Sequence, residues 1–453
     1  MTGSSRIIGD ALMPAVETPV STFQALKEKI ESKTARVGIV GLGYVGLPLA
    51  VEFAKAGFHV TGIDLQQSRV DRLMRGESYV QDVPSSEVDE LVKAGRLDAT
   101  TDFSIVGKLD TINICVPTPL RKTKDPDMSY IVSASDEIAK FFHPGLLVIL
   151  ESTTYPGTTD ELLLPTFEKN GLKVGEDFFL CFSPERVDPG NPVYQTLNTP
   201  KVVGGITPAC TEMGKLFFAQ ALEHVVPVAN TRVAEMVKLL ENTFRMINIG
   251  LVNELAIMCD GMGINVWEVI DAAATKPFGF MPFYPGPGLG GHCIPIDPFY
   301  LSWKTKQSGI EARFIELAGY INGNMPHFVA SKVQGALNNH GKAVKGAHVH
   351  VVGVAYKRNI EDMRESPALD VILLLKKLGA EITYSDPYVP KLTFDDFELA
   401  SQDALAAATR ADCCVIITDH TNFDYKGLLN AAKLVVDTRN ALRGVESEKI
   451  VRL

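Results

Sequence analysis

The 453-residue sequence lacks the features of several classes of protein. No apolar run reaches the roughly 18 residues that a membrane-spanning helix needs, and the N-terminal region lacks the basic stretch and apolar core of a signal peptide. Basic residues are not in excess, because the formal net charge is -10, and wrapping nucleic acid requires a basic footprint. We therefore expect neither a membrane nor a nucleic acid as a partner, although a local positive pocket can still bind a small anion.

The seven cysteines form no framework. They are scattered and odd in number, and no pair has the spacing of zinc ligands. We expect no disulfide, no metal site and a reducing, cytoplasmic compartment. Hydrophobic residues make up 46% of the chain and charged residues 22%, which is ordinary for a globular protein, and the length suggests about two to four domains.

The first half of the sequence has the pattern of an α/β domain. Residues Ala35–Val40 and Phe58–Ile63 are apolar runs typical of buried strands, and the stretch between them opens with a glycine turn and continues with helical spacing. Four more strands are expected, at Thr111–Val116, Leu146–Leu150, Phe178–Phe182 and Lys201–Val203. The alternation predicts a parallel, doubly wound sheet. Ahead of it, residues 1–33 are expected to form a polar extension with one short helix, around Thr22–Ile30.

The second half begins with a proline-free stretch that predicts one long helix from Thr231 to Gly261. Its apolar positions are too many for one narrow stripe, so we expect it to be buried, linking two lobes and packing against its copy in a homodimer or higher homo-oligomer. A long loop rich in proline and glycine follows, and such loops are usually functional. An α/β pattern then resumes and predicts a second Rossmann-like lobe, a distant copy of the first. Its expected elements are strand His348–Val354, helix Ser366–Leu378, and strands Glu381–Ser385, Cys413–Thr418 and Leu434–Asp437.

The segment after the first strand contains Gly41-x-Gly43-x-x-Gly46 directly before a helix. The first glycine permits a tight turn, the second lets the backbone approach a pyrophosphate, and the third lets helix and strand pack closely. Asp64 ends the next strand at an offset of about 20 residues, where a carboxylate binds ribose hydroxyls. This context predicts a dinucleotide site and favours NAD over NADP. The alternative is a glycine turn with a structural role only.

Cys293 lies between glycines and a proline in the loop GGHCIPIDP, which is an unusual place for a core-filling cysteine. A thiolate there could attack an aldehyde carbonyl, and Asp297 in the same loop could position or deprotonate water. His292 suggests a Cys-His pair, but adjacent residues point different ways, so we do not favour it. The alternative is a loop cysteine of no consequence. The other six cysteines are expected to be inert.

Three pairs of polar residues are further candidates: Lys238 with Asn242, Glu185 with Arg186, and Lys357 with Arg364. The first pair shares one face of the long helix and could hold an oxyanion or a water. The second follows a predicted strand, where ligands bind in open α/β sheets, and could supply a general base and a substrate contact. The third follows the first strand of the second lobe and could bind phosphate. Each pair could equally be solvated surface charge.

Taken together, these residues resemble the UDP-glucose/GDP-mannose dehydrogenase family from about Ala35 to the C-terminus. The resemblance rests on ordered motifs: VGLGYVGLPLA, CVPTP, ESTTYPGTT, FSPERVDPGN, EMVKLLENTFR, GPGLGGHCIPIDPFYL, GVAYKRNIEDMRESP and TYSDP. The cysteine loop and FSPERVDPGN are most similar to those of UDP-N-acetylglucosamine 6-dehydrogenases. UDP-glucose members more typically have a GGSC-type loop, and UDP-N-acetylmannosamine members usually vary the residues after the cysteine.

The resemblance implies a mechanism in which a C6 alcohol is oxidised to an aldehyde, captured by the cysteine as a thiohemiacetal, oxidised to a thioester and hydrolysed. The implied catalytic residues are Cys293, Lys238, Asn242, Asp297, Glu185 and Thr153. The implied NAD contacts are Gly41, Gly43, Tyr44, Val45, Gly46, Asp64, Arg69, Thr118 and Arg364. The implied UDP-sugar contacts are Arg186, Lys238, Asn242, Arg245, Phe283, Tyr284, Gly290 and Lys357, with the loop 283–288.

The expected organisation is an N-terminal extension (1–33), an NAD-binding Rossmann domain (34–230), a central helical region with the cysteine loop (231–330) and a UDP-sugar-binding Rossmann-like domain (331–453). The expected substrate is UDP-N-acetylglucosamine, with UDP-N-acetylmannosamine, UDP-N-acetylgalactosamine and UDP-glucose as alternatives. By resemblance, the product feeds capsule or lipopolysaccharide synthesis.

One departure from the family concerns the segment after Glu185. Glucose-type members often have a second glutamate four residues later, whereas this sequence has Pro189, preceded by Asp188. Our hypothesis is that the larger N-acetyl substrate accounts for the change.

Two other functions fit part of the pattern. A two-electron dehydrogenase of a hydroxy acid or acyl-CoA would use the first lobe but give no role to Cys293. A non-catalytic dinucleotide-binding protein would bind NAD without turnover.

Overall fold

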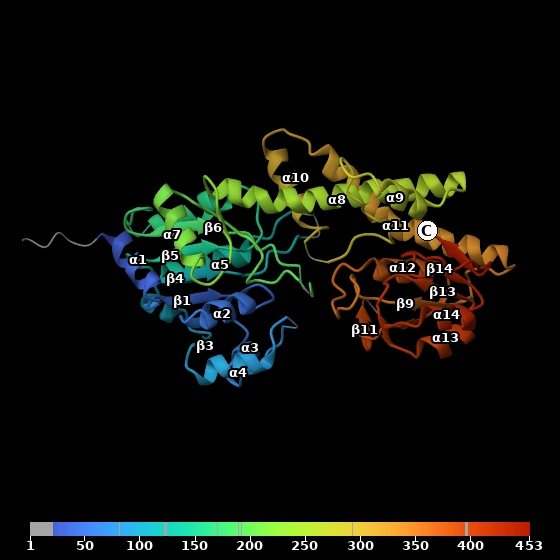
Figure 1. Ribbon diagram of the computed structural model, residues 1–453, viewed down its shortest axis with the longest axis horizontal. Helices are drawn as coiled ribbons and strands as arrows, with labels where there is room; N and C mark the ends of the chain where they lie inside the picture. The colour runs from blue at the N-terminus through green and yellow to red at the C-terminus, as the bar shows by residue number, and fades with distance from the viewer. Residues whose placement is uncertain are drawn as a thin grey trace, which may run out of the picture.

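The computed structural model describes residues 21–80, 82–121, 125–169, 171–188, 190–191, 193–291, 293–394 and 397–453. Two α/β lobes lie at opposite ends of the molecule, and a long helix, α8 (Thr231–Met262), extends from one lobe to the other (Figure 1). The expectation of two Rossmann-like lobes joined by a long helix is therefore confirmed. The expected N-terminal helix is present as α1 (Thr22–Glu31), and residues 1–20 lie outside the described part.

The first lobe is built on an eight-stranded sheet of order β3-β2-β1-β4-β5-β6-β7-β8. Its strands are β1 (Arg36–Val40), β2 (His59–Ile63), β3 (Leu97–Thr100), β4 (Thr111–Ile114), β5 (Leu147–Leu150), β6 (Phe179–Phe182), β7 (Lys201–Gly205) and β8 (Val225–Pro227). Its remaining helices are α2 (Gly46–Lys55), α3 (Gln67–Met74), α4 (Ser85–Lys93), η1 (Phe103–Lys108), α5 (Ser129–Ala139), η2 (Thr159–Leu163), α6 (Leu164–Glu168) and α7 (Pro208–Phe218). One apolar core includes side chains of α1, α2, α4 and α7, and another includes α5 and α6. The carboxyl ends of the central strands are where a ligand is expected to bind in a sheet of this kind.

One detail of the predicted sheet is wrong: β7 runs antiparallel to β6, with Cys181 opposite Gly205 and Phe182 opposite Gly204. The physical reason lies in the connection between them. A parallel neighbour needs a crossover, usually through a helix, and the described residues between Phe182 and Lys201 contain no helix. The chain therefore turns back alongside β6, and the first residue of β7 lies near the carboxyl end of β6.

The second lobe contains a five-stranded parallel sheet of order β10-β9-β13-β14-β15 and a separate hairpin. The strands of the sheet are β9 (His348–Val352), β10 (Glu381–Ser385), β13 (Cys413–Ile416), β14 (Val435–Asp437) and β15 (Ile450–Arg452), and those of the hairpin are β11 (Lys391–Phe394) and β12 (Phe397–Ala400). The helices are α12 (Pro367–Lys377), α13 (Ala404–Arg410) and α14 (Tyr425–Ala431). The predicted elements of this lobe are all present, while β15 and the hairpin were not predicted.

The central region consists of α8, α9 (Val266–Ala273), α10 (Asp297–Gln307) and α11 (Arg313–Asn339). Asn230 caps the start of α8 by accepting a hydrogen bond from the backbone N–H of Val233, and Gly263, with φ of +68°, ends it in the left-handed conformation that favours glycine. The predicted long helix is thus confirmed. α11 packs along α8, and its second half contributes to the core of the second lobe, so the two helices together connect the lobes.

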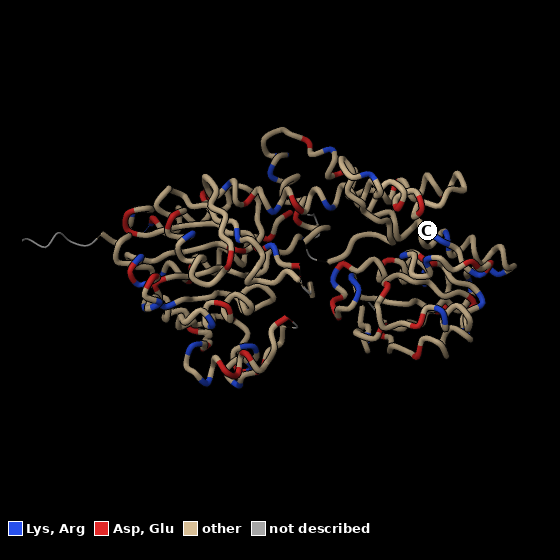
Figure 2. Tube along the Cα trace, in the orientation of Figure 1, with Lys and Arg blue, Asp and Glu red and all other residues tan. Residues whose placement is uncertain are grey.

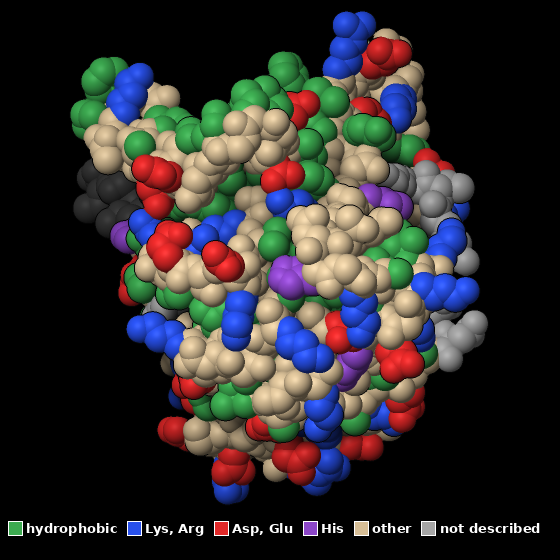
Figure 3. Space-filling model, turned by 90° about the vertical axis from the view of Figure 1, so that its right-hand side faces the viewer, with side chains coloured by type: hydrophobic (Ala, Val, Ile, Leu, Met, Phe, Trp, Pro, Cys, Tyr) green, Lys and Arg blue, Asp and Glu red, His purple; other side chains and the backbone are tan. Residues whose placement is uncertain are grey.

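α8 is less buried than the sequence predicts. Apolar side chains on α8 and α11 are exposed, among them Leu240 at 60% and Phe314 at 75%. Figure 3 shows apolar side chains gathered along the upper edge of the molecule, where Figure 1 places these helices. Among the described residues, no helix has the length and apolar character needed to cross a membrane.

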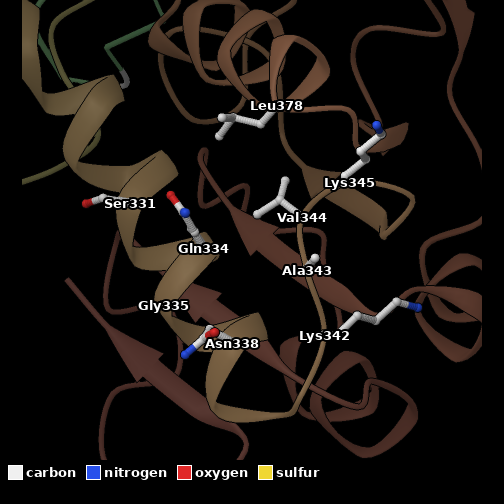
Figure 4. Close-up of a pocket in the computed structure, with 9 residues that line it drawn as sticks. All are labelled: Ser331, Gln334, Gly335, Asn338, Lys342, Ala343, Val344, Lys345 and Leu378. Atoms are coloured by element: carbon white, nitrogen blue, oxygen red, sulfur yellow. The ribbon is translucent and has the colours of Figure 1, made fainter.

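A surface hollow of about 540 Å³ lies where the last turns of α11 meet the segment 342–345 (Figure 4). Ser331, Gln334 and Asn338 line it from the helix. It contains none of the residues predicted to bind NAD or substrate.

Candidate active site

The predicted dinucleotide loop follows β1. Gly41 has φ of +93°, and a Cβ atom on it would lie 2.7 Å from the carbonyl oxygen of Cys115. A Cβ atom on Gly46 would lie 1.9 Å from the carbonyl oxygen of Gly41, so both positions require glycine. Gly43 differs, because a Cβ atom there would meet no described atom within 4 Å. The space above Gly43 is open where a pyrophosphate would approach the backbone.

Asp64 follows β2 and lies beside this loop. Its carboxylate accepts hydrogen bonds from the backbone N–H groups of Leu42 and Gln66, both at 2.9 Å, and pairs with Arg69 at 3.2 Å. These contacts fix the carboxylate at the edge of the glycine loop, where a ribose-binding acid is expected. The loop and Asp64 therefore fit a dinucleotide.

The other predicted NAD contacts surround this loop. Tyr44 is exposed, and the guanidinium of Arg364 lies 5.3 Å from the centre of its ring, so the second lobe reaches the first at this point. Val45 packs against the core of the first lobe. The backbone carbonyl of Thr118 accepts a hydrogen bond from the hydroxyl of Tyr300.

The predicted catalytic residues come together between the lobes. Lys238 Nζ donates to Thr153 Oγ1 at 2.6 Å, and one turn later along α8 the amide of Asn242 donates to Asp297 Oδ2 at 2.6 Å. The backbone N–H of Asp297 in turn donates to the carbonyl oxygen of Cys293 at 2.7 Å. Of the seven cysteines, Cys293 alone is partly exposed, and the other six are buried. Helix α8 therefore aligns a cation and an amide with the cysteine loop.

Burial and mutual charge set the protonation of this group. Burial raises the pKa of the Cys293 thiol, and the ammonium of Lys238 opposes that rise. Burial also raises the pKa of Asp297 to about 6, although Lys238 and the hydrogen bond from Asn242 both act to lower it. Burial works against the charged form of Lys238, but Cys293, Asp297 and other neighbouring groups outweigh it and raise its pKa. Asp297 is thus able to exchange a proton near neutral pH.

Glu185 lies behind this group, after β6. Its Oε1 atom accepts the backbone N–H groups of Arg186 and Val187, each at 2.8 Å, and its Oε2 atom pairs with Lys201 at 3.2 Å. Burial favours the protonated form, but Lys201 and the backbone hydrogen bond from Val187 outweigh it, so the pKa of Glu185 is lowered. It is held as a carboxylate.

The positively charged residues predicted to contact substrate differ in their partners. Arg186 forms a bidentate ion pair with Glu241 of α8, with N···O distances of 2.6 and 3.2 Å. Lys357 of the second lobe pairs with Asp188 of the first at 2.7 Å. Arg245 on α8 is exposed and has no ion-pair partner among the described residues. In Figure 2, charges of both signs lie along the side of the second lobe that faces the first.

The loop residues predicted to contact substrate pack against the central helices and the second lobe. The ring of Phe283 lies edge-on to that of Phe244, with centres 5.7 Å apart. Tyr284 donates its hydroxyl to Asp271 at 3.0 Å and stacks on Trp267. A Cβ atom on Gly290 would lie 2.5 Å from Cβ of Tyr356, so this glycine allows a close approach to the second lobe. His292 and Pro189 lie outside the described residues.

Comparison with known proteins identifies the family. Three domains of the UDP-glucose/GDP-mannose dehydrogenase family match in order: the NAD binding domain over residues 35–222, the central domain over 232–324 and the UDP binding domain over 350–444. The chain belongs to this family. The resemblance expected from the sequence is confirmed. The predicted class of activity, an NAD-dependent oxidoreductase of nucleotide sugars, is confirmed with it.

Individual relatives differ in the sugar they are named for. The UDP-N-acetyl-D-glucosamine 6-dehydrogenase of Pseudomonas aeruginosa is 38% identical over 79% of this chain and 84% of its own. The UDP-N-acetyl-D-mannosamine dehydrogenase of Salmonella typhimurium is 36% identical over 90% of this chain and 99% of its own. The solved structure of the UDP-D-ManNAc dehydrogenase from Pyrococcus horikoshii has a TM-score of 0.84 and 31% identity, and the match covers 92% of this chain and 98% of that one.

Two basic residues near the candidate site were not suggested by the sequence. Arg439 follows β14, donates Nε to the carbonyl of Ile417 at 2.9 Å, and has its Nη1 2.5 Å from where a Cβ atom on Gly286 would stand. Its position after a predicted strand was a usable signal, by the same rule that drew attention to Glu185. Lys201 is buried between two carboxylates, and nothing in the sequence indicated this, because it begins a strand whose direction was predicted wrongly.

Proposed function

We propose that this protein oxidises the C6 alcohol of UDP-N-acetylglucosamine to UDP-N-acetylglucosaminuronic acid, through a covalent intermediate on Cys293. The observation that carries the proposal is the convergence of Cys293, Lys238 and Asp297 on one site between the lobes. A solvent-reachable thiol beside a buried lysine and a carboxyl group able to exchange protons is an arrangement suited to aldehyde capture. The open space above Gly43 leaves room for NAD at the facing edge of the first lobe.

NAD, held at the glycine loop and Asp64, would supply the hydride acceptor for both oxidations. In the first oxidation, Lys238 and Asn242 stabilise the oxygen as it loses its proton. The sulfur of Cys293 then adds to the aldehyde carbon, and Asp297 transfers the thiol proton to the aldehyde oxygen, which becomes the hydroxyl group of the thiohemiacetal. The C–S bond persists through the second oxidation, which yields a thioester. Each hydride leaves with one proton from oxygen, so the electrons balance at two NADH.

Hydrolysis of the thioester completes the reaction. Thr153, hydrogen-bonded to Lys238 at 2.6 Å, holds the water, and Glu185 or Asp297 accepts its proton. The C–O bond forms, the C–S bond breaks, and the thiolate is reprotonated to restore Cys293. Lys238 stabilises the oxyanion that forms between these two events. The four electrons have by then been removed, so hydrolysis needs no further oxidant.

In this proposal, the substrate binds between the two lobes. Lys357 of the second lobe supplies positive charge for the diphosphate, and Arg245 of α8 adds an exposed guanidinium, while Arg364, beside Tyr44, is assigned to NAD. For Lys357 to bind a phosphate, the substrate must compete with Asp188, which is within 2.7 Å. The product is a nucleotide-sugar acid for capsule or lipopolysaccharide synthesis, made in the cytoplasm, where seven unpaired cysteines are stable.

UDP-N-acetylmannosamine is the second candidate substrate. It is favoured by several relatives named for that sugar, each covering about nine-tenths of this chain. The relative with 38% identity, named for UDP-N-acetylglucosamine, supports the first candidate. The two sugars differ only in the configuration at C2, so the chemistry at C6 is the same for both.

We also propose that the protein forms a homodimer through the exposed apolar face of α8 and α11. A contiguous apolar face of this kind is uncommon on a monomer. A second copy of the chain would cover residues such as Leu240 and Phe314 with the same surface.

The deciding experiment counts NADH per sugar consumed, with UDP-N-acetylglucosamine, UDP-N-acetylmannosamine, UDP-N-acetylgalactosamine, UDP-glucose and GDP-mannose offered separately. Two NADH for each UDP-N-acetylglucosamine support both the sugar and the cysteine mechanism. Two NADH for each UDP-N-acetylmannosamine, and none with UDP-N-acetylglucosamine, would support the cysteine mechanism and identify the second candidate as the substrate. One NADH per sugar would contradict the role of Cys293.

A further inference from the structure

Lys201 is buried between two carboxylates at the edge of the candidate site. Its side chain is 6% exposed, and its Nζ atom lies 2.6 Å from Glu151 and 3.2 Å from Glu185. The side chain of Glu151 is fully buried and also accepts a short hydrogen bond from Asn113. The three charged residues thus form a cluster with one positive and two negative charges, and breaking such a buried group by removing the cation is costly.

The direction of β7 explains how Lys201 reaches this place. With Cys181 opposite Gly205 and Phe182 opposite Gly204, the antiparallel register brings the first residue of β7 level with the chain just beyond β6, where Glu185 lies. In a parallel β7, Lys201 would lie at the opposite end of β6. A second contact agrees with this register, because Ser183 donates its hydroxyl to the carbonyl of Val202 at 2.7 Å. The antiparallel pairing of β7 with β6 therefore places a cation at the edge of the sheet where a ligand is expected to bind.

Several charged groups face Glu185 from the surrounding elements. Lys201 on β7 and Lys238 on α8 favour its carboxylate form. Glu151, after β5, is a like charge in the same cluster: the charge of Glu185 raises the pKa of Glu151, and repulsion between two nearby carboxylates also opposes ionisation of Glu185. The thiols of Cys115 and Cys293 are close enough for the charge of Glu185 to raise the pKa of each. Among these groups, Lys201 acts most strongly on Glu185.

We infer that Lys201 is a positioning residue that keeps Glu185 ionised and fixed behind Cys293. The inference rests on the proposed role of Glu185 as a proton acceptor in hydrolysis. Oε1 of Glu185 is held by two backbone amides and Oε2 by Lys201, so the carboxylate cannot rotate without losing these contacts. Lys201 belongs to no predicted set of substrate or cofactor contacts, and its charge also acts to lower the pKa of Lys238. Its direct contact with the proposed machinery is the ion pair with Glu185.

The first test replaces Lys201 by methionine, which keeps an unbranched side chain of similar length and removes the charge. Losing a close opposite charge is expected to raise the pKa of Glu185 by about one to three units. The acid limb of the pH dependence of kcat should then move to higher pH or become steeper than in the wild type. Lys201→Arg keeps the charge and should retain the wild-type profile. Lys140→Met, at an exposed ion pair at the C-terminal end of α5, is the matched control and should also retain the wild-type profile.

A second variant distinguishes an electrostatic role from structural damage. Adding Glu151→Gln to Lys201→Met removes the carboxylate that repels Glu185, so the acid limb should return part of the way towards the wild-type position. Damage to packing would instead accumulate in the double variant. If Lys201→Met fails to fold, the double variant is compared with Glu151→Gln alone. An identical acid limb in those two proteins would overturn the inference.

The protonation of Glu185 can also be followed without turnover. A protonated carboxyl group has an infrared C=O stretch that a carboxylate lacks. That band should appear at higher pH in Lys201→Met than in the wild type, and it should be missing when Glu185→Gln is added. Absence of any such shift would overturn the inference whatever the activity. By contrast, if the wild-type protein reduces NAD with none of the sugars, the proposed function is contradicted. The infrared result would then still decide the role of Lys201.

Discussion

The amide of Asn242 donates a hydrogen bond to Asp297 at 2.6 Å and thereby connects the long helix to the cysteine loop. This hydrogen bond favours the ionised carboxyl group, while burial opposes ionisation and leaves the pKa of Asp297 at about 6. The pKa of Asp297 is therefore set in part by a residue that is 55 positions away in the sequence. Proton transfer through Asp297 should therefore depend on pH near the pKa of this residue, at about 6.

We predict that kcat falls as the pH drops through about 6, because protonated Asp297 can no longer accept a proton. Asn242→Leu removes the hydrogen bond to the charged form, which is expected to move this limb upward by about one to two pH units. The measurement is kcat against pH for both proteins at saturating substrate. A limb that stays in place in the variant would show that Asp297 is not the titrating group.

A second prediction concerns the nucleophile. Cys293→Ser should abolish formation of the acid, because a hydroxyl group is a much weaker nucleophile than a thiolate and the captured intermediate does not form. The variant should release at most one NADH per sugar, with an aldehyde detectable by a hydrazine reagent. Cys259→Ser, in the buried part of α8, is the matched control and should still give two NADH. Undiminished acid from Cys293→Ser would refute covalent catalysis.

Gly43 and Lys201 show which features of the candidate site the sequence could predict and which it could not. The spacing around Gly43 predicted both its place after β1 and its open approach, because the requirement is local and involves only a strand, a turn and a helix. The burial of Lys201 could not be predicted in this way. It depends on the direction of β7, and that direction follows from a long irregular connection whose course the residue pattern does not specify. The pairing of Arg186 with Glu241 escaped prediction for the same reason.

The predicted duplication of the lobes has a specific counterpart in the structure. In the first lobe, the backbone N–H of Gly41 donates to the carbonyl of Ile63, and in the second that of Gly353 donates to the carbonyl of Ser385, each at 2.8 Å. Both glycines have positive φ and follow the first strand of their lobe. The turn that opens a dinucleotide site is therefore present twice.

The second copy of this turn is closed to a dinucleotide. Asp386 corresponds in place to Asp64, but its carboxylate is fully buried, pairs with His420 at 2.9 Å and accepts the backbone N–H of Val354 at 2.7 Å. No ribose can reach it. Sequence pattern alone suggested the shared design, whereas the loss of the pocket depends on His420, which comes from a different strand connection.

A third prediction concerns Glu235, which lies one turn before Lys238 on α8. Its buried carboxylate accepts the backbone N–H groups of Gly157 and Thr159 and so fixes the segment after Thr153. Burial raises its pKa from 4.5 to about 7. Because the raised pKa favours the protonated form in the folded chain, the stability that this carboxyl group contributes is present below about pH 4.5 and is lost as the pH rises to about 7.

Glu235→Gln cannot titrate, so the difference in unfolding free energy between wild type and variant should change over this interval, by an amount on the order of 3 kcal/mol. Urea unfolding at several pH values measures it. The exposed Glu176→Gln provides a control in which the difference should stay constant. A constant difference for Glu235→Gln as well would mean that Glu235 titrates at its ordinary pKa.

The last prediction concerns the apolar face of α8 and α11. If two copies of the chain join there, a charge at Leu240 or Phe314 is buried without a partner in the dimer but remains solvated in the monomer. Leu240→Glu and Phe314→Glu should therefore shift the chain towards monomers, with the dissociation constant raised tenfold or more, which corresponds to about 1.4 kcal/mol. Sedimentation velocity over a range of concentrations measures the shift. Leu65→Glu places the same charge at a position that is 75% exposed on the first lobe and should leave assembly unchanged. Both α8 and α11 lie beside the cysteine loop, so loss of NADH formation together with loss of the dimer would show that assembly supports the site. An unchanged dimer in both variants would instead place the interface elsewhere.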